Sequence, residues 1–184
     1  MIYYKGAGNS PALISFSESC MSQEKKDFLN MLQNLIITLA VVILVFSFFL
    51  GVKMAPNEDM EPRISAGDIL IYYRIAKTPS VEDVVIFKKN GTDYVGRVIG
   101  NPGDEIDIQK ENLFINGHAK IETNIYGVTP SYEGFVDYPL TLGQNEYFIL
   151  ADHREGGEDS RYFGPVNKSE IKGTIIGLFR RNAM

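Results

Sequence analysis

Two aspartates, Asp59 and Asp159, are the side chains whose type could carry acid–base chemistry together. An aspartic-protease mechanism needs two carboxyl groups that share a proton about 3 Å apart. The only histidines, His118 and His153, lack the spacing of metal ligands. We therefore expect no metal and no cofactor, and we interpret both histidines as surface or loop residues.

Asp59 and Asp159 lie in the first and last of three segments that combine polar side chains with turn residues. Residues 57–64 read NEDMEPRI and are followed by Gly67-Asp68. Residues 93–104 read DYVGRVIGNPGD, and residues 151–164 read ADHREGGEDSRYFG. Pro-Gly-Asp at the end of the second segment predicts a tight turn, because proline fixes φ and glycine supplies a positive φ.

In this order and at this spacing, the three segments resemble the motifs of type I signal peptidases. That family uses a serine nucleophile and a neutral lysine base on an all-β scaffold behind one or more N-terminal membrane spans. The resemblance covers roughly residues 30–180. The matching residues are Met60, Pro62, Gly67, Asp68, the run from Arg97 to Asp104, Asp152, Asp159, Ser160, Arg161 and Gly164.

The resemblance fails at the residues that would cut a peptide bond. Asp59 stands in place of the nucleophilic serine, and Gly96 in place of the lysine base. Gly157 replaces the serine that orients the lysine, and Asn57 replaces the residue that helps to form the oxyanion hole. His153 replaces an asparagine.

These substitutions remove the chemistry of a serine peptidase. Such catalysis needs an activated nucleophile within hydrogen-bond reach of a base. The Asp59 carboxylate is a weak nucleophile toward an amide, and Gly96 offers no group that could accept a proton. In subtilisin, loss of the nucleophile or of the base costs on the order of 10⁶ in kcat. We expect no functioning catalytic residue.

The resemblance also implies roles for the residues that remain. It assigns a peptide-binding cleft to Asp59, Met60, Pro62, Tyr94 and Gly96. It assigns structural roles to Arg97, Pro102, Gly103, Asp104, Asp152, Asp159, Ser160 and Arg161. An ion pair between Asp159 and Arg161 is favoured over an Asp59–Asp159 dyad, because the corresponding aspartate and arginine of the family pair with each other.

Gly96 has two structural interpretations. Strand alternation places Tyr94, Gly96 and Val98 on one face, where a glycine can open a gap or let another backbone approach. Such a gap would suit an extended peptide. A simple β-bulge is the alternative.

The elements that must position these residues are short strands. We predict strands over 83–87, 94–99, 113–115, 118–121, 146–150 and 173–179. Asn90-Gly91 and Asn116-Gly117 each join two of them, and this dipeptide is a strong signal of a hairpin turn. Many short strands with regular turns indicate an all-β sandwich or barrel-like sheet. The stretch 122–142 predicts an irregular loop packed by its own aromatic residues, among them Tyr126.

The N-terminal region predicts a membrane anchor. Residues 35–52 read LIITLAVVILVFSFFLGV, close to the ~20 apolar residues that cross a bilayer. A buried core helix is disfavoured because the run is apolar on every side. A cleavable signal is disfavoured because the run is long and no small-x-small site follows it. We expect a cytoplasmic segment over 1–30, a signal anchor over 31–52 and an extracytoplasmic domain over 53–184.

Charge supports this orientation weakly and excludes one class of partner. Lys25 and Lys26 precede the span, and basic flanks favour the cytoplasm. Residues 53–184 hold 15 Lys and Arg against 20 Asp and Glu, a net charge of −5, which does not resemble the basic surface of a nucleic-acid-binding protein. Cys20 is the only cysteine, so no intrachain disulfide can form. Whether translation starts at Met1 or Met21 stays open.

Within the family, the Asp-for-Ser and Gly-for-Lys pattern resembles a group of proteins from pilus loci of Gram-positive bacteria. Its members keep the fold, lack the Ser/Lys pair and are needed for pilus polymerisation with a sortase. The resemblance implies a non-catalytic assembly factor that binds pilin subunits or the pilus sortase. An active membrane signal peptidase with unorthodox residues is the alternative.

Overall fold

The computed structural model describes residues 11–75, 77–122, 125 and 127–180, with side chains described from residue 23 onward. It divides into two units, Met1–Ser47 and Phe48–Met184, and each is described by itself. The side chains of Met1, Cys20, Met21 and Tyr126 lie outside the described residues, so the structure does not bear on which methionine starts the chain.

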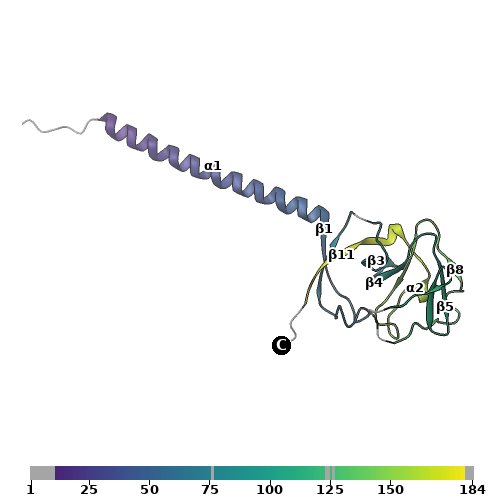
Figure 1. The fold of residues 1–184 in the computed structure, drawn as a ribbon. Coiled ribbons are helices and arrows are strands. Elements are labelled where there is room, and N and C mark those ends of the chain that lie inside the picture. The colour runs from purple at the N-terminus through teal and green to yellow at the C-terminus, as the bar shows by residue number, and fades with distance from the viewer. Residues whose placement is uncertain (1–10, 76, 123–124, 126, 181–184) are drawn as a thin grey trace, which may run out of the picture. The chain divides into compact units, whose positions relative to one another are not determined.

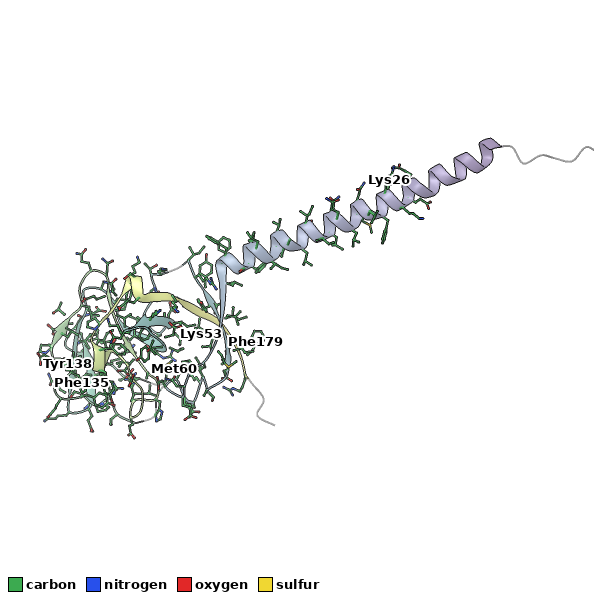
Figure 2. The ribbon with its side chains drawn as sticks, turned by 180° about the vertical axis from the view of Figure 1, so that it is seen from behind. Lys26, Lys53, Met60, Phe135, Tyr138 and Phe179 are labelled. Atoms are coloured by element: carbon green, nitrogen blue, oxygen red, sulfur yellow. The ribbon has the colours of Figure 1, made fainter. Side chains whose placement is uncertain are left out.

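The first unit is dominated by α1, a helix over Pro11–Phe49. Within it, Gln23–Phe49 is long and apolar enough to cross a membrane, and its side chains are exposed all along its length (Figure 2). The expected end of the span at Val52 is wrong, because Leu50–Met54 forms strand β1 and pairs with β2. Hydropathy does not distinguish an apolar helix from an apolar strand, so it does not locate the end of α1. The pairing of β1 with β2 depends on Gly51, whose missing Cβ leaves room for the Tyr72 ring.

The second unit is the all-β domain that the sequence predicts, built from two antiparallel sheets (Figure 1). The larger sheet has the order β1-β2-β11-β3-β4-β9-β10. Its other strands are β2 (Ile69–Tyr73), β3 (Val84–Lys89), β4 (Thr92–Gly100), β9 (Glu146–Leu150), β10 (Val166–Asn167) and β11 (Ile171–Phe179). The smaller sheet has the order β7-β6-β5-β8, with β5 (Glu105–Gln109), β6 (Asn112–Ile115), β7 (His118–Ala119) and β8 (Leu140–Thr141). A short helix α2 (Ser160–Phe163) and a 3-10 turn η1 (Lys168–Glu170) complete the described elements.

Both predicted hairpins are confirmed. Asn90 and Gly91 have φ of 51° and 88° between β3 and β4, and Asn116 and Gly117 have 52° and 76° between β6 and β7. These positive angles are those of a type I′ turn. All six predicted strands are present, while β1, β2, β5, β8 and β10 were not predicted. The alternation of Ile106, Asp107 and Ile108 was a signal for β5.

Strand β4 is the centre of the domain because both of its faces are buried. Val95 packs in one apolar cluster with Met60 and Leu70, whereas Val98 packs in a second with Phe87 and Ile149. At its end, the turn Pro102-Gly103-Asp104 leads into the smaller sheet. Gly103 has φ of 90°, and its N–H donates to the Leu142 C=O at 3.0 Å. Leu142 N–H in turn donates to the Asp104 C=O at 2.9 Å. The turn thereby fastens one sheet to the other.

Buried arginines fix the segment after β9. Arg97 of β4 donates to both oxygens of Asp152, at 2.8 and 2.6 Å. Arg154 is fully buried and forms two bonds to Glu122, at 2.8 and 2.5 Å. Arg161 likewise binds Asp159. All three guanidinium groups are therefore paired with carboxylates.

The loop over 122–142 corrects one expectation. Its described rings, those of Tyr132, Phe135 and Tyr138, pack against aromatic residues outside the loop. Tyr132 stacks on Tyr162 at 4.3 Å between centroids, and Tyr138 meets Phe148 at 6.4 Å. The Arg161 guanidinium also lies 4.9 Å from the Tyr132 ring centroid. Such distant partners cannot be read from the loop's own sequence.

We predict that Arg97→Ala lowers the free energy of unfolding by about 3–5 kcal/mol, because it leaves the Asp152 carboxylate buried without a partner. Urea unfolding of the full chain in detergent measures the change. The double variant Arg97→Met/Asp152→Leu should lose less, since it leaves no buried charge. Equal losses in the single and double variants would contradict this account.

Candidate functional site

The turn that carries Asp59 is tied back to the sheet by the Gly67-Asp68 motif. Gly67 N–H donates to the Ala55 C=O at 3.0 Å, and Ala55 N–H donates to the Asp68 C=O at 2.8 Å. Met60 is 2 % exposed and lies in the core, inside the domain in Figure 2. Met60 packs in the apolar core and thereby anchors the turn.

Asp59 itself is buried, with 9 % of its surface exposed. Asn57 Nδ2 donates to its Oδ2 at 2.5 Å, and His153 N–H donates to its backbone C=O at 2.8 Å. Burial raises the pKa of the Asp59 carboxyl, and the nearby charges of Asp159 and Glu158 add to this effect, while the Asn57 hydrogen bond opposes it. Asn57 thus fixes the orientation of the Asp59 carboxyl.

Gly157 lies beside Asp59, so the structure brings the first and third segments together. A Cβ at Gly157 would lie 3.6 Å from Asp59 Cβ, but it would collide with Ala151 Cβ and lie 3.0 Å from the His153 carbonyl oxygen. A serine does not fit here without a shift of the backbone. The segment has closed around the glycine.

Gly96 opens no gap, but it lets another backbone approach: a Cβ there would lie 3.2 Å from the Leu150 carbonyl oxygen. It is buried, and a Cβ there would lie 2.6 Å from Ile149 Cγ2 and 3.3 Å from Phe87 Cε1. The alternative of a bulge at Gly96 is wrong, because Gly96 pairs in register with Val85, and β4 shifts register only between Val98 and Gly100. Ile149 and Phe87 of the apolar core lie where a side chain at Gly96 would begin.

The two aspartates do not form a dyad. Asp159 Oδ1 accepts from Arg161 Nε at 2.9 Å, and its Oδ2 accepts from Arg161 Nη2 at 2.8 Å and from Ala151 N–H at 2.9 Å. Both oxygens are thereby committed to donors. Ser160 is structural as well, since its Oγ accepts from Ile149 N–H at 3.0 Å.

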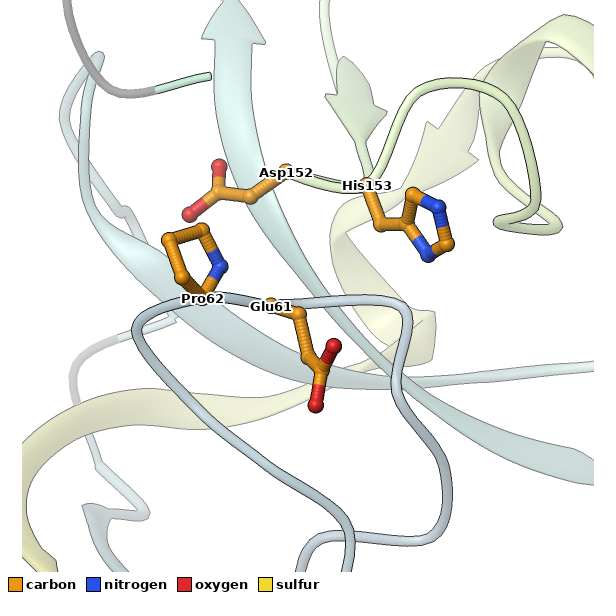
Figure 3. A pocket seen from close by; sticks show the side chains of 4 residues that line it. All are labelled: Glu61, Pro62, Asp152 and His153. Carbon is orange, nitrogen blue, oxygen red and sulfur yellow. The ribbon is translucent and has the colours of Figure 1, made fainter. Parts of the chain in front are cut away.

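A small pocket lies between the Asp59 turn and the segment after β9. It measures about 190 Å³ and is lined by Glu61, Pro62, Asp152 and His153. Figure 3 shows these side chains on two facing segments. The sequence predicts Pro62 in a cleft but not Glu61 or His153. Both lie within segments that resemble family motifs, 57–64 and 151–164, and this position could have indicated them.

Tyr94 lies beside the site rather than in the pocket. Its hydroxyl donates to Glu158 Oε2 at 3.0 Å, and its ring stacks on Phe87 at 5.6 Å. Burial raises the pKa of the Tyr94 hydroxyl, and the Glu158 hydrogen bond adds to it. No cluster of three metal-ligating side chains occurs within the part of the chain that the structure describes. The arrangement offers surfaces for binding, and among the described residues no activated nucleophile.

Comparison with known proteins gives a consistent result. The family model described as "Signal peptidase, peptidase S26" matches residues 28–179. A probable signal peptidase I-2 of Synechocystis sp. is 26% identical over 169 residues, covering 86% of this chain and 76% of the relative. A signal peptidase IB of Staphylococcus aureus is 27% identical over 173 residues, covering 84% and 91%. A crystal structure of a signal peptidase I from Enterococcus faecalis V583 is 28% identical with a TM-score of 0.45, covering 53% of this chain and 97% of that one.

We predict that Gly96→Lys lowers the free energy of unfolding by about 1–3 kcal/mol, because the added side chain overpacks the contact with Ile149 and Phe87. Chemical denaturation of the full chain tests this. Thr92→Lys, on the exposed start of the same strand, is the matched control and should change stability by less than about 0.5 kcal/mol. A Gly96→Lys protein as stable as the control would show that space for a lysine exists.

A second prediction concerns pH. A carboxyl whose pKa is higher in the folded than in the unfolded chain favours folding at low pH, and this contribution is lost as pH rises through the folded-state pKa. Asp59→Asn removes the buried charge, so the variant should be more stable than the wild type at pH 7. The difference should shrink as pH falls toward 4. Melting curves across this range measure it, with exposed Glu58→Gln as control; a difference independent of pH would refute the assignment.

Proposed function

The chain belongs to the signal peptidase family, peptidase S26, and from that premise we propose that it is a non-catalytic member that assists sortase-dependent pilus polymerisation. In this role it binds pilin subunits or the pilus sortase. It holds a polypeptide segment beside Asp59 without cutting it.

The packing around Gly96 is the observation that carries the non-catalytic part of the proposal. A peptidase of this kind needs a base next to its nucleophile. Here Ile149 and Phe87 occupy the space beyond the Gly96 backbone, and Ala151 blocks a side chain at Gly157. Asn57 holds the Asp59 carboxyl through a hydrogen bond, and the Asp159 carboxylate is already paired with Arg161.

The pilus part of the proposal is supported by the pattern of substitutions, Asp59 for serine and Gly96 for lysine. A site without catalytic residues can still bind a peptide. A peptide that adds as a strand is held by main-chain hydrogen bonds and by small pockets, and neither needs a serine or a lysine. We propose the membrane as the site of action, with the span retained, the N-terminus in the cytoplasm and the β domain outside the cell membrane.

An active signal peptidase is the second candidate, since the relatives reported above are named signal peptidases. It would have to use Asp59 in a new way. The raised pKa of the buried Asp59 carboxyl is the one feature in its favour. The pairing of Asp159 with Arg161 counts against it, because it removes the obvious partner for proton sharing.

Two measurements separate the candidates. We expect the purified full chain in detergent micelles to leave signal-peptide substrates intact, and a deletion strain to lose the high-molecular-mass ladder of polymerised pilin on immunoblots. Wild-type and Asp59→Ala genes should both restore the ladder, because no catalytic step depends on the carboxylate. Substrate cleavage that disappears in Asp59→Ala would establish the peptidase instead, and a normal ladder in the deletion strain would remove the pilus role.

A further inference from the structure

The pocket next to Asp59 has walls of different chemical character. Glu61 supplies a carboxylate, Pro62 an apolar ring and His153 an imidazole (Figure 3). The fourth side chain, Asp152, is neutralised by its two bonds to Arg97. The volume of about 190 Å³ equals that of about six water molecules at ~30 Å³ each. This suits one long side chain.

The walls are held in place before any ligand arrives. Glu61 N–H donates to the Glu58 C=O at 3.1 Å, and His153 N–H donates to the Asp59 C=O at 2.8 Å, which links the two facing segments. The His153 ring rests against Gly156, where a Cβ would lie 3.2 Å from its Cε1. A site that is already ordered loses less conformational entropy on binding.

Glu61 is the one carboxylate among the described lining residues that no ion pair neutralises. Glu61 is half-buried, yet among the described residues it forms no ion pair. The neighbouring segments carry the exposed carboxylates Glu58, Glu155 and Glu158, which form no ion pair with a described basic group either. A half-buried carboxylate without a partner is costly, and walls of one charge sign concentrate the field in a cleft.

We propose that this pocket binds the cationic side chain of a lysine or arginine in a partner polypeptide. The Glu61 carboxylate pairs with the charged head, and the Pro62 ring packs on the methylene stem. His153 supplies a ring nitrogen that can accept a hydrogen bond. The identity of the partner as pilin or sortase rests on the proposed function, whereas the chemistry of the pocket does not.

A partner-independent titration tests the pocket itself. The probes are the capped peptides Gly-Gly-Lys-Gly-Gly and Gly-Gly-Arg-Gly-Gly, with a norleucine analogue as the uncharged control, each added up to about 20 mM to the full chain in micelles. NMR follows the rings of the only two histidines. We expect the cationic peptides to shift His153 with a millimolar Kd, while His118, exposed on β7, stays unchanged.

Three variants test whether the peptides bind at this pocket. Glu61→Gln should abolish the His153 shift and its dependence on salt, whereas Glu58→Gln, on the same turn but outside the pocket, should retain both. Gly156→Ala should weaken the shift by moving the ring, since Gly156 does not have a positive φ and the backbone tolerates alanine. An equal shift with norleucine, a shift in Glu61→Gln, or no shift at the highest concentration would each overturn the proposal.

The partner itself gives a second readout. Once a pilin or sortase is shown to bind the full chain, Glu61→Gln should weaken that complex about tenfold, as expected for loss of a hydrogen bond to a charged group. Glu58→Gln should leave it within twofold. If neither pilin nor sortase binds the wild type while the peptides still shift His153, the pilus role fails and the cation pocket stands. If the complex forms but is indifferent to Glu61→Gln, the pocket is not used.

Discussion

The pairing of buried arginines with carboxylates is the constraint on which the site depends. Burying a guanidinium group away from water is costly unless an opposite charge lies beside it and its N–H donors have hydrogen-bond acceptors. Arg97, Arg154 and Arg161 meet this condition through Asp152, Glu122 and Asp159. These pairs connect β4, the loop over 122–142 and the segment 151–161. They hold that segment beside the Asp59 turn, where His153 N–H donates to the Asp59 C=O.

The interior around Gly96 and Gly157 is closely packed. A Cβ at Gly96 would lie 2.6 Å from Ile149 Cγ2, and one at Gly157 would collide with Ala151 Cβ. Close-packed interiors do not admit added atoms without movement of their neighbours. Larger side chains at Gly96 and Gly157 would therefore require their neighbours to move. What stays accessible is the rim, with Pro62, Glu61 and His153 around a small pocket.

A rim of this kind suits recognition more than chemistry. The domain is acidic, its segments around the pocket carry several exposed carboxylates, and the apolar helix that precedes it is long enough to span a membrane. These charges favour the binding of a basic polypeptide segment that we propose above. Binding then requires only that the pocket be ordered in advance, and the buried ion pairs supply that order.

The sequence by itself determined the strands with clear alternation, both Asn-Gly hairpins and the apolar helix, because each depends on neighbours within a few residues. It did not determine the helix end at Phe49, the core position of Met60, the filled space at Gly96 or the pocket at Glu61 and His153. These depend on contacts between distant segments, such as Gly96 with Ile149, or Glu61 facing His153. Only the tertiary structure decides which side chain occupies a given volume, because packing is a property of all the segments that meet there.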